Sequence, residues 1–238
     1  MRISTRNYIV LFVLCLALII PGAVSACQQT LVLVSGADTR SAGYNTTEPI
    51  DPLDDPAGYG HVWSPAVASS DIASTWYHAD QAPFGSGAVW VSSAAIREGA
   101  SSEDQWRLFR QDFTLPAGST IDSANLAYTA DNAVDVYLNG VLITSTGQVN
   151  DMAPVDHSDY STAYSADFTP QTGSNTMLFV VRNFKNTGFN PSALLYNATI
   201  QYTVPDTSAP EFPSVFFPVT MIIGFLGAVL FIQRTREF

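Results

Sequence analysis

The segment from residue 131 to residue 144 constrains the fold more than any other part of the chain. Polar and apolar side chains alternate along its first half, as in a strand with one buried face: Val134, Asp135, Val136, Tyr137 and Leu138. Asn139-Gly140 comes next, and this pair favours the two positive-φ positions of a type I′ turn. The segment therefore predicts a β-hairpin whose second strand begins at Val141.

The rest of the central region repeats this pattern of short apolar segments separated by Gly, Pro, Asn and Asp, with almost no helical periodicity. We expect strands at Thr30–Ser35, Ala88–Ser92, Gln105–Leu115, Ile121–Ala130, Tyr164–Phe168, Asn175–Phe184 and Ser192–Val204, and short ones near His61–Trp63 and Thr75–Tyr77. Within Gln105–Leu115, alternation places Trp106, Leu108 and Arg110 on one face and Phe109 on the other. The pattern predicts an all-β, antiparallel sandwich over residues 27–204.

Four segments resemble motifs of the galactose-binding-like jelly rolls, in the same order along the chain. They are Trp106–Pro116, Ala130–Gly140, Asn175–Asn183 and Asn190–Leu195. The resemblance implies a jelly-roll β-sandwich. It does not select a function, because this scaffold carries carbohydrate-binding modules, enzyme accessory domains and structural domains. The family often holds a structural calcium ion in a loop, but no loop of this sequence offers a complete ligand set.

The N-terminus has the pattern of a secretory signal peptide over residues 1–26. Arg2 and Arg6 precede a short apolar run, and Val24-Ser25-Ala26 places small residues before Cys27, where cleavage is expected. The same four residues also resemble a lipobox, in which Cys27 would carry lipid. Both interpretations predict export.

The C-terminus carries an uncharged apolar run from Ser214 to Ile232, followed by Arg234 and Arg236. Such a run is long enough for a transmembrane helix, which we expect over residues 214–233. The basic residues, in a tail of residues 234–238, favour the cytoplasmic side. The sandwich is then expected on the extracellular face of the cell membrane.

A short linker over residues 205–213 precedes this run and ends in Pro210, Glu211, Phe212 and Pro213. This motif, the apolar run and the basic end together resemble the PEF-CTERM sorting signal of archaeal surface proteins. The resemblance implies an archaeosortase-like enzyme that cuts near the motif and transfers the protein to a lipid. The alternative is a plain single-pass anchor.

The exterior segment, residues 27–210, is strongly acidic, with six basic and 19 acidic side chains and a net charge of −13. Such a surface argues against nucleic acid and anionic membranes as partners. Cys27 is the only cysteine left after signal cleavage, so no internal disulfide is expected.

No sequence motif for a nucleophile, a zinc site or a phosphate loop occurs, and we expect no enzymatic activity. Asp151, Asp156 and Asp159 offer oxygen ligands that suit Ca²⁺, against the alternative of a solvated loop. Trp63, Trp76 and Tyr77 are candidates for stacking on sugar rings. Two sequons place candidate N-glycosylation sites at Asn45 and Asn197.

We therefore expect a non-catalytic cell-surface protein, an envelope, adhesion or matrix component, with other surface proteins or glycans as partners. A carbohydrate-binding module is the first alternative. An extracellular glycan hydrolase is the more remote one.

Overall fold

The computed structural model describes residues 26–45, 62–69, 74–85, 87–93, 104–150, 159–188, 190–205 and 216–236. The chain divides into two compact units. One unit is the β-sandwich, Gln28–Val204, and the other comprises Met1–Cys27 and Pro205–Phe238. Each unit is described by itself.

The first sheet of the sandwich contains six strands. Their order is β10 (Tyr164–Asp167), β7 (Thr120–Asp131), β12 (Ala193–Pro205), β5 (Val91–Ser92) and β4 (Val67–Ala68), and β1 (Ala26–Val34) also pairs with β12. The long β7–β12 ladder forms its centre, with Tyr128 opposite Tyr196. A short 3₁₀ helix, η1 (Asp159–Ser161), precedes β10.

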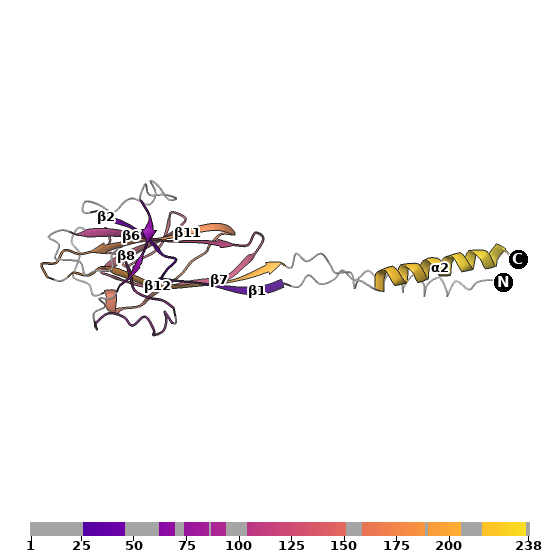
Figure 1. Ribbon diagram of the computed structural model, residues 1–238, viewed down its shortest axis with the longest axis horizontal. Helices are drawn as coiled ribbons and strands as arrows, with labels where there is room; N and C mark the ends of the chain where they lie inside the picture. The colour runs from indigo at the N-terminus through magenta and orange to yellow at the C-terminus, as the bar shows by residue number, and fades with distance from the viewer. Residues whose placement is uncertain are drawn as a thin grey trace. The chain divides into compact units, whose positions relative to one another are not determined.

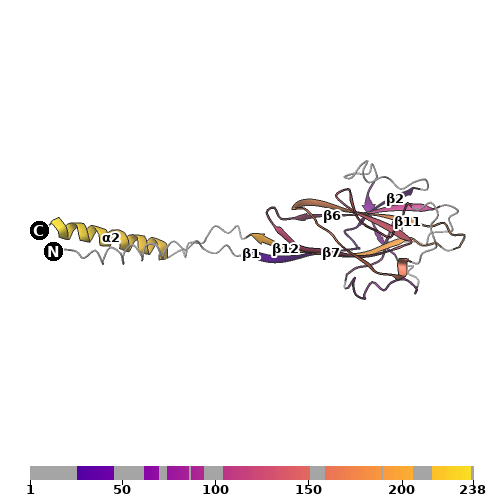
Figure 2. The ribbon, with the colours of Figure 1, turned by 180° about the vertical axis from the view of Figure 1, so that it is seen from behind.

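The second sheet also has six strands, in the order β3 (Ser64–Pro65), β2 (Arg40–Asn45), β6 (Gln105–Leu115), β11 (Gly173–Asn183), β8 (Ala133–Leu138) and β9 (Val141–Ser145). β11 pairs antiparallel with both β6 and β8, and β2 pairs antiparallel with β6. Figures 1 and 2 show the two sheets as the two layers of the sandwich, with β2, β6 and β11 in one layer and β1, β7 and β12 in the other.

The main core lies between the sheets and is built by strand alternation. β11 contributes Met177, Phe179 and Val181, and β12 contributes Tyr196 and Ile200. Phe179 and Tyr196 stack across the two layers with ring centroids 4.5 Å apart. The central strands therefore hold the layers together mainly by apolar contact.

Two smaller clusters bury the outer faces of the sheets. On the second sheet, Leu108, Leu178 and Val180 pack with Val149. On the first sheet, Leu195 packs with a group of aromatic side chains from the segment 76–90. Because both faces of β11 are covered, its central residues 177–181 form a continuous apolar run rather than an alternating one.

The expected hairpin is confirmed. β8 and β9 pair with Leu138 opposite Val141. Asn139 and Gly140 have φ angles of 52° and 83°, as a type I′ turn requires. The seven longer expected strands all occur within a few residues of the expected bounds, although only Val91–Ser92 of the Ala88–Ser92 segment is a strand.

The short strand expected near His61–Trp63 occurs as β3, which begins at Ser64. Two details of the strand prediction were wrong. β2 was not expected, because the segment from Arg40 to Asn45 lacks the β-branched residues that favour strands; it forms by pairing with β6. Thr75–Tyr77 lies in turns and irregular structure. These are tertiary effects that local composition does not report.

The second unit contains the helix α2 (Phe216–Arg236), which matches the expected helical segment. Seven of its apolar side chains are each more than half exposed: Met221, Ile222, Ile223, Phe225, Leu226, Leu230 and Ile232. Across the residues that the structure describes, no helix combines the length and the apolar character needed to cross a membrane. The transmembrane span expected over residues 214–233 is therefore not confirmed.

Candidate functional site

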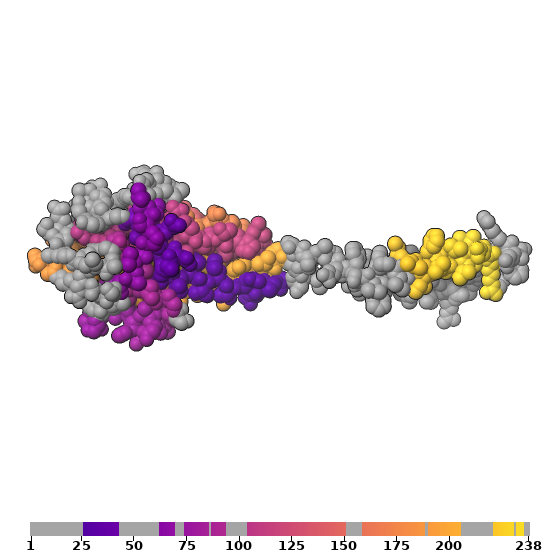
Figure 3. Space-filling view, in the orientation of Figure 1, coloured from indigo at the N-terminus to yellow at the C-terminus, as the bar shows by residue number. Residues whose placement is uncertain are grey.

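A groove of about 500 Å³ lies on the side of the sandwich where β1, β2 and β6 meet. Its lining residues, here called the arginine groove, are Leu31, Val32, Leu33, Asp38, Arg40, Arg110, Gln111, Asp112 and Phe113. Figure 3 shows β1 and β2, in indigo, at the surface of the face turned toward the viewer.

Strand pairing explains why the groove forms at this place. β2 begins at Arg40, which pairs with Arg110, and runs along β6 only toward Trp106. On the β2 side of β6, no described strand pairs with residues 111–115; β11 pairs with them on the opposite side. β1 pairs with β12 alone among the described strands, so its other side is also an edge. The groove therefore lies between two strand edges that belong to different sheets.

Two arginines stand side by side in the groove. Arg40 and Arg110 are directly opposite each other across β2 and β6, a position in which like charges destabilise a sheet. Asp112 offsets part of this repulsion, because its Oδ1 accepts a hydrogen bond from Arg110 Nε at 2.8 Å. The Arg110 guanidinium also lies 5.7 Å from the centre of the Trp63 ring, within cation–π range.

The groove also holds acceptor groups. Asp38 is exposed, and the Asp112 side chain is 49% exposed. Asp112 Oδ1 accepts a second hydrogen bond from Thr176 Oγ1 at 2.7 Å. Positive, negative and apolar groups thus line one small volume, an arrangement suited to a ligand with several kinds of polar group.

A buried chain of hydrogen bonds supports the floor of the groove. The Tyr196 hydroxyl donates to Gln111 Oε1 at 2.9 Å. It therefore accepts from Thr39 Oγ1 at 2.8 Å, because a phenol has only one proton to donate. Burial, with a further contribution from Asp38, raises the pKa of Tyr196 far above its usual value, so the donor stays protonated. The chain fixes the side-chain amide of Gln111.

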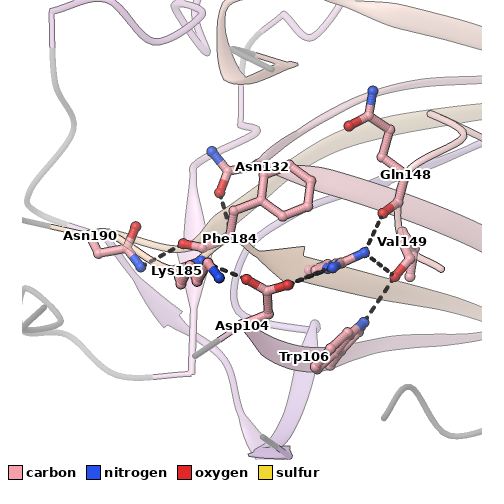
Figure 4. A network of polar contacts seen from close by, with 9 residues as sticks. Asp104, Trp106, Asn132, Gln148, Val149, Phe184, Lys185 and Asn190 are labelled. Atoms are coloured by element: carbon pink, nitrogen blue, oxygen red, sulfur yellow. Dashed lines mark hydrogen bonds and ion pairs between the residues drawn. The ribbon is translucent and has the colours of Figure 1, made fainter. Parts of the chain in front are cut away.

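A second polar network, drawn in Figure 4, includes Asp104, Gln148 and Val149. These residues surround Arg182, which lies near the end of β11. Its guanidinium donates to Asp104 Oδ2 from Nη2 at 2.5 Å, and from Nη1 to the carbonyl oxygens of Gln148 at 2.9 Å and Val149 at 3.2 Å. The rings of Trp106 and Phe184 lie 5.1 and 5.0 Å from the guanidinium carbon. Arg182 is only 6% exposed, so this network ties chain segments together rather than presenting a charge.

Asp104 completes this tie. Its Oδ1 accepts a hydrogen bond from the backbone N–H of Lys185 at 2.8 Å. Burial by itself would raise the pKa of Asp104, but the hydrogen bonds and charge of Arg182, with the Lys185 N–H, hold that pKa below its ordinary value. The carboxylate therefore stays ionised next to Arg182.

The three aromatic residues proposed for sugar stacking have different surroundings. Trp76 is only 4% exposed and packs in the outer cluster of the first sheet, so it presents no open face. Tyr77 is half-buried there; its hydroxyl donates to the carbonyl oxygen of Ala82. Trp63 is half-buried beside the groove. Of the three, Trp63 alone lies by the arginine pair.

The candidate glycosylation sites also differ. Asn197 faces away from the main core, as glycosylation requires. Its Nδ2, however, donates to the carbonyl oxygens of Phe84 at 2.5 Å and Pro83 at 3.4 Å. The atom that would carry a glycan is therefore engaged. Asn45 pairs with Trp106 through the β2–β6 ladder, and its side chain lies outside the described part of the chain.

The structure describes one of the three candidate calcium ligands. Asp159 is buried, and its Oδ1 accepts from the Tyr164 hydroxyl at 2.6 Å. Among the residues that the structure describes, its Oδ2 has no hydrogen-bond partner. Asp151 and Asp156 lie outside the described residues. Within the described ranges, no group of three or more His, Cys, Asp or Glu side chains is placed to hold a metal ion.

The sorting residues Pro210, Glu211, Phe212 and Pro213 and the cleavage-site residue Val24 also fall outside the described residues. Ala26 and Cys27 are exposed at the start of β1.

Sequence reasoning missed the arginine groove. It placed Arg110 on one face of the strand Gln105–Leu115, but it expected no strand at Arg40. One signal was present in the sequence. Basic residues are rare in this acidic region, so an exposed arginine there is a candidate for binding an anionic group.

Comparisons with known proteins add no family. No protein-family model matches the chain, and no curated protein matches it. Solved structures with some likeness include a β-glucuronidase from an uncultured Clostridium species, with 12% identity and a TM-score of 0.35 over 75% of this chain and 30% of that chain. A native family 35 carbohydrate-binding module from Clostridium thermocellum has 10% identity and a TM-score of 0.31, over 71% of this chain and 97% of that one.

A β-glucuronidase from Faecalibacterium prausnitzii is similar at 17% identity, with a TM-score of 0.36 over 81% of this chain and 38% of that chain. The chain thus spans well under half of the glucuronidases that it matches. At TM-scores this low, the similarities carry no argument about activity or ligand.

Proposed function

We propose that this chain is an exported, non-catalytic cell-surface protein whose β-sandwich binds glycans at the arginine groove. The observation that carries the proposal is the groove itself, where Arg40 and Arg110 lie among carboxylates and beside Trp63. The assignment to the galactose-binding-like jelly rolls belongs to the same proposal and rests on the four sequence motifs.

Glycans suit this lining because a sugar ring offers both hydroxyl groups and apolar C–H faces. Asp38 and Asp112 can accept hydrogen bonds from hydroxyl groups, and Gln111 is held in place by Tyr196. Leu31 and Phe113 add apolar side chains to the lining. Binding sites for small ligands commonly combine such apolar walls with a few fixed polar groups.

Export and membrane attachment form the second part of the proposal. The N-terminal pattern of a basic start, an apolar run and small residues before Cys27 supports secretion. The exposed apolar side chains of α2, from Met221 to Ile232, support contact of this helix with lipid. The Pro210–Pro213 motif supports processing by an archaeosortase-like enzyme, and the acidic sandwich would then be displayed as an adhesion or envelope component.

A glycan array tests the binding function. The full-length protein in detergent should bind a defined subset of glycans saturably, and Trp63→Ala should weaken that binding. Lys185→Gln, an exposed change away from the groove, is the matched control. Binding that Trp63→Ala leaves unchanged would place the site elsewhere, and the absence of any glycan binding would refute the proposal.

Intact-mass measurement of the native protein tests the second part. A mass that lacks residues 1–26 and the segment from Ser214 to Phe238 would support processing at both ends. If Ser214–Phe238 is still attached in the surface protein, the sortase proposal fails and a plain anchor stands. The same spectrum reports any lipid on Cys27.

A further inference from the structure

We propose that the arginine groove selects acidic saccharides, with a carboxylate or sulfate group of the sugar bound between Arg40 and Arg110. The inference rests on the proposed glycan-binding function and names the class of glycan. The ligand chemistry is an oxyanion carried on a hydroxyl-rich chain.

The placement of positive charge is the first argument. The sandwich is strongly acidic, and its few basic side chains have unequal exposure. Arg107 and Arg182 are 2% and 6% exposed, respectively, so their charges are buried and are not presented to solvent. Among the described residues of the sandwich, Arg40, Arg110 and Lys185 remain as the basic side chains that reach solvent. Two of these three stand opposite each other at one groove.

The orientation of the arginines is the second argument. A guanidinium binds a carboxylate or sulfate through paired N–H donors, which lie in one plane. Arg110 is oriented by its Nε bond to Asp112 and by the ring of Trp63. Arg110 and Arg40 both line the groove. An oxyanion between the two arginines would also relieve their mutual repulsion across the ladder.

The carboxylates in the groove limit what else can bind. Asp38 and Asp112 would repel a ligand whose anionic groups are not accompanied by neighbouring hydroxyl donors, such as DNA. They favour a ligand whose negative group is followed by hydrogen-bond donors. Asp112 Oδ2 makes no hydrogen bond within the described residues, and it can accept one from a sugar hydroxyl. An acidic saccharide has this alternation of groups.

The experiment is a set of calorimetric titrations of the full-length protein in detergent. The probes are an oligogalacturonate hexasaccharide, which carries carboxylates, dextran sulfate, which carries sulfate esters, and neutral dextran. Arg40→Gln removes one guanidinium from an exposed position, so the fold should be retained. Lys185→Gln removes the same charge elsewhere on the sandwich and controls for net charge.

We expect an acidic probe to bind and neutral dextran not to bind. Arg40→Gln should weaken binding at least about tenfold, as the loss of a charge-assisted hydrogen-bonded pair predicts. Lys185→Gln should change it by less than about twofold, and the melting temperature of both variants should match that of the parent protein. The acidic probe that is more sensitive to Arg40→Gln identifies carboxylate or sulfate as the preferred group.

Several outcomes would overturn the inference. If the two variants weaken binding equally, the effect is one of net charge and not of the groove. If dextran binds as well as the acidic probes and Arg40→Gln changes nothing, glycan binding stands but selection of an oxyanion does not. If only a poly-aspartate peptide binds in an Arg40-dependent way, the groove recognises acidic peptides instead. If no saccharide in the probe set or on the glycan array binds, both the proposed function and this inference fail.

Discussion

Trp76 and Trp90 pack with their ring centroids 4.5 Å apart and their planes at 49°, outside the first sheet rather than between the two sheets. Trp90 Nε1 donates to the carbonyl oxygen of Tyr77 at 2.9 Å, which ties the two ends of the 76–90 segment together. Trp76 thus contributes apolar burial, and an aromatic residue in an irregular segment is part of a second core.

Replacing Trp76 with Ala should therefore destabilise the sandwich. A buried tryptophan reduced to alanine costs about 3–5 kcal/mol, which urea denaturation can measure. Trp63→Ala is the matched comparison and should cost less, because Trp63 is only half-buried. Unchanged stability of Trp76→Ala combined with lost glycan binding would contradict the packing role.

Asp104→Asn should make the stability of the sandwich less dependent on acid. Because the folded-state pKa of Asp104 is lowered, its ionised form stabilises the fold above its ordinary value of 3.8, and this contribution is lost as the pH falls through the lower folded value. The stability difference between parent and variant should therefore shrink below pH 3.8. Asp80→Asn, an exposed charge removal, is the control. A difference that stays constant with pH would contradict the linkage.

Asp135→Asn should show the opposite sign. Burial raises the pKa of Asp135, and a hydrogen bond from Ser145 opposes this only in part. The folded protein thus holds the proton more tightly than the unfolded chain does. Stability is therefore lost as the pH rises from 3.8 through the folded value, and the variant should be free of this loss. Denaturation midpoints of parent and variant at acidic and neutral pH measure this loss. If the midpoints of both proteins change with pH in parallel, the prediction is refuted.

Tyr196→Phe should weaken both the core and the groove. The change leaves Gln111 Oε1 and the Thr39 hydroxyl without their shared partner, and a buried polar group left unpaired costs about 1–3 kcal/mol. Because Gln111 is then no longer fixed, glycan affinity should also fall. Tyr128→Phe is a useful control, since the Tyr128 hydroxyl bonds to Thr144, which does not line the groove. An equal loss of affinity in both variants would argue against a specific role for Gln111.

Asn197 should be unmodified in the native protein. Its Nδ2 is engaged by the carbonyl oxygens of Pro83 and Phe84, and a glycan on this atom would displace the 76–90 segment. Glycopeptide mass spectrometry should find the peptide containing Asn197 without sugar. A high glycan occupancy at Asn197 would contradict the prediction, because Nδ2 could not then be engaged by Pro83 and Phe84.

The local features of this fold could be predicted from the sequence because their causes are local. Asn139-Gly140 supplies positive φ angles where a tight hairpin needs them, and alternation along β6 divides Trp106 and Phe109 between two faces. Strand length and the faces of the long strands follow from such patterns.

The candidate site could not be predicted because its cause is the pairing of distant segments. Arg40 and Arg110 become neighbours only when β2 joins β6, and β2 has little strand propensity of its own. Likewise, Trp76 is buried because Trp90 and the outer face of the first sheet meet it. The sequence by itself determined an acidic, strand-rich chain with a defined hairpin and apolar ends. The tertiary structure decided which aromatic rings are covered and where the scarce positive charge is concentrated, because both depend on contacts between residues far apart in the chain.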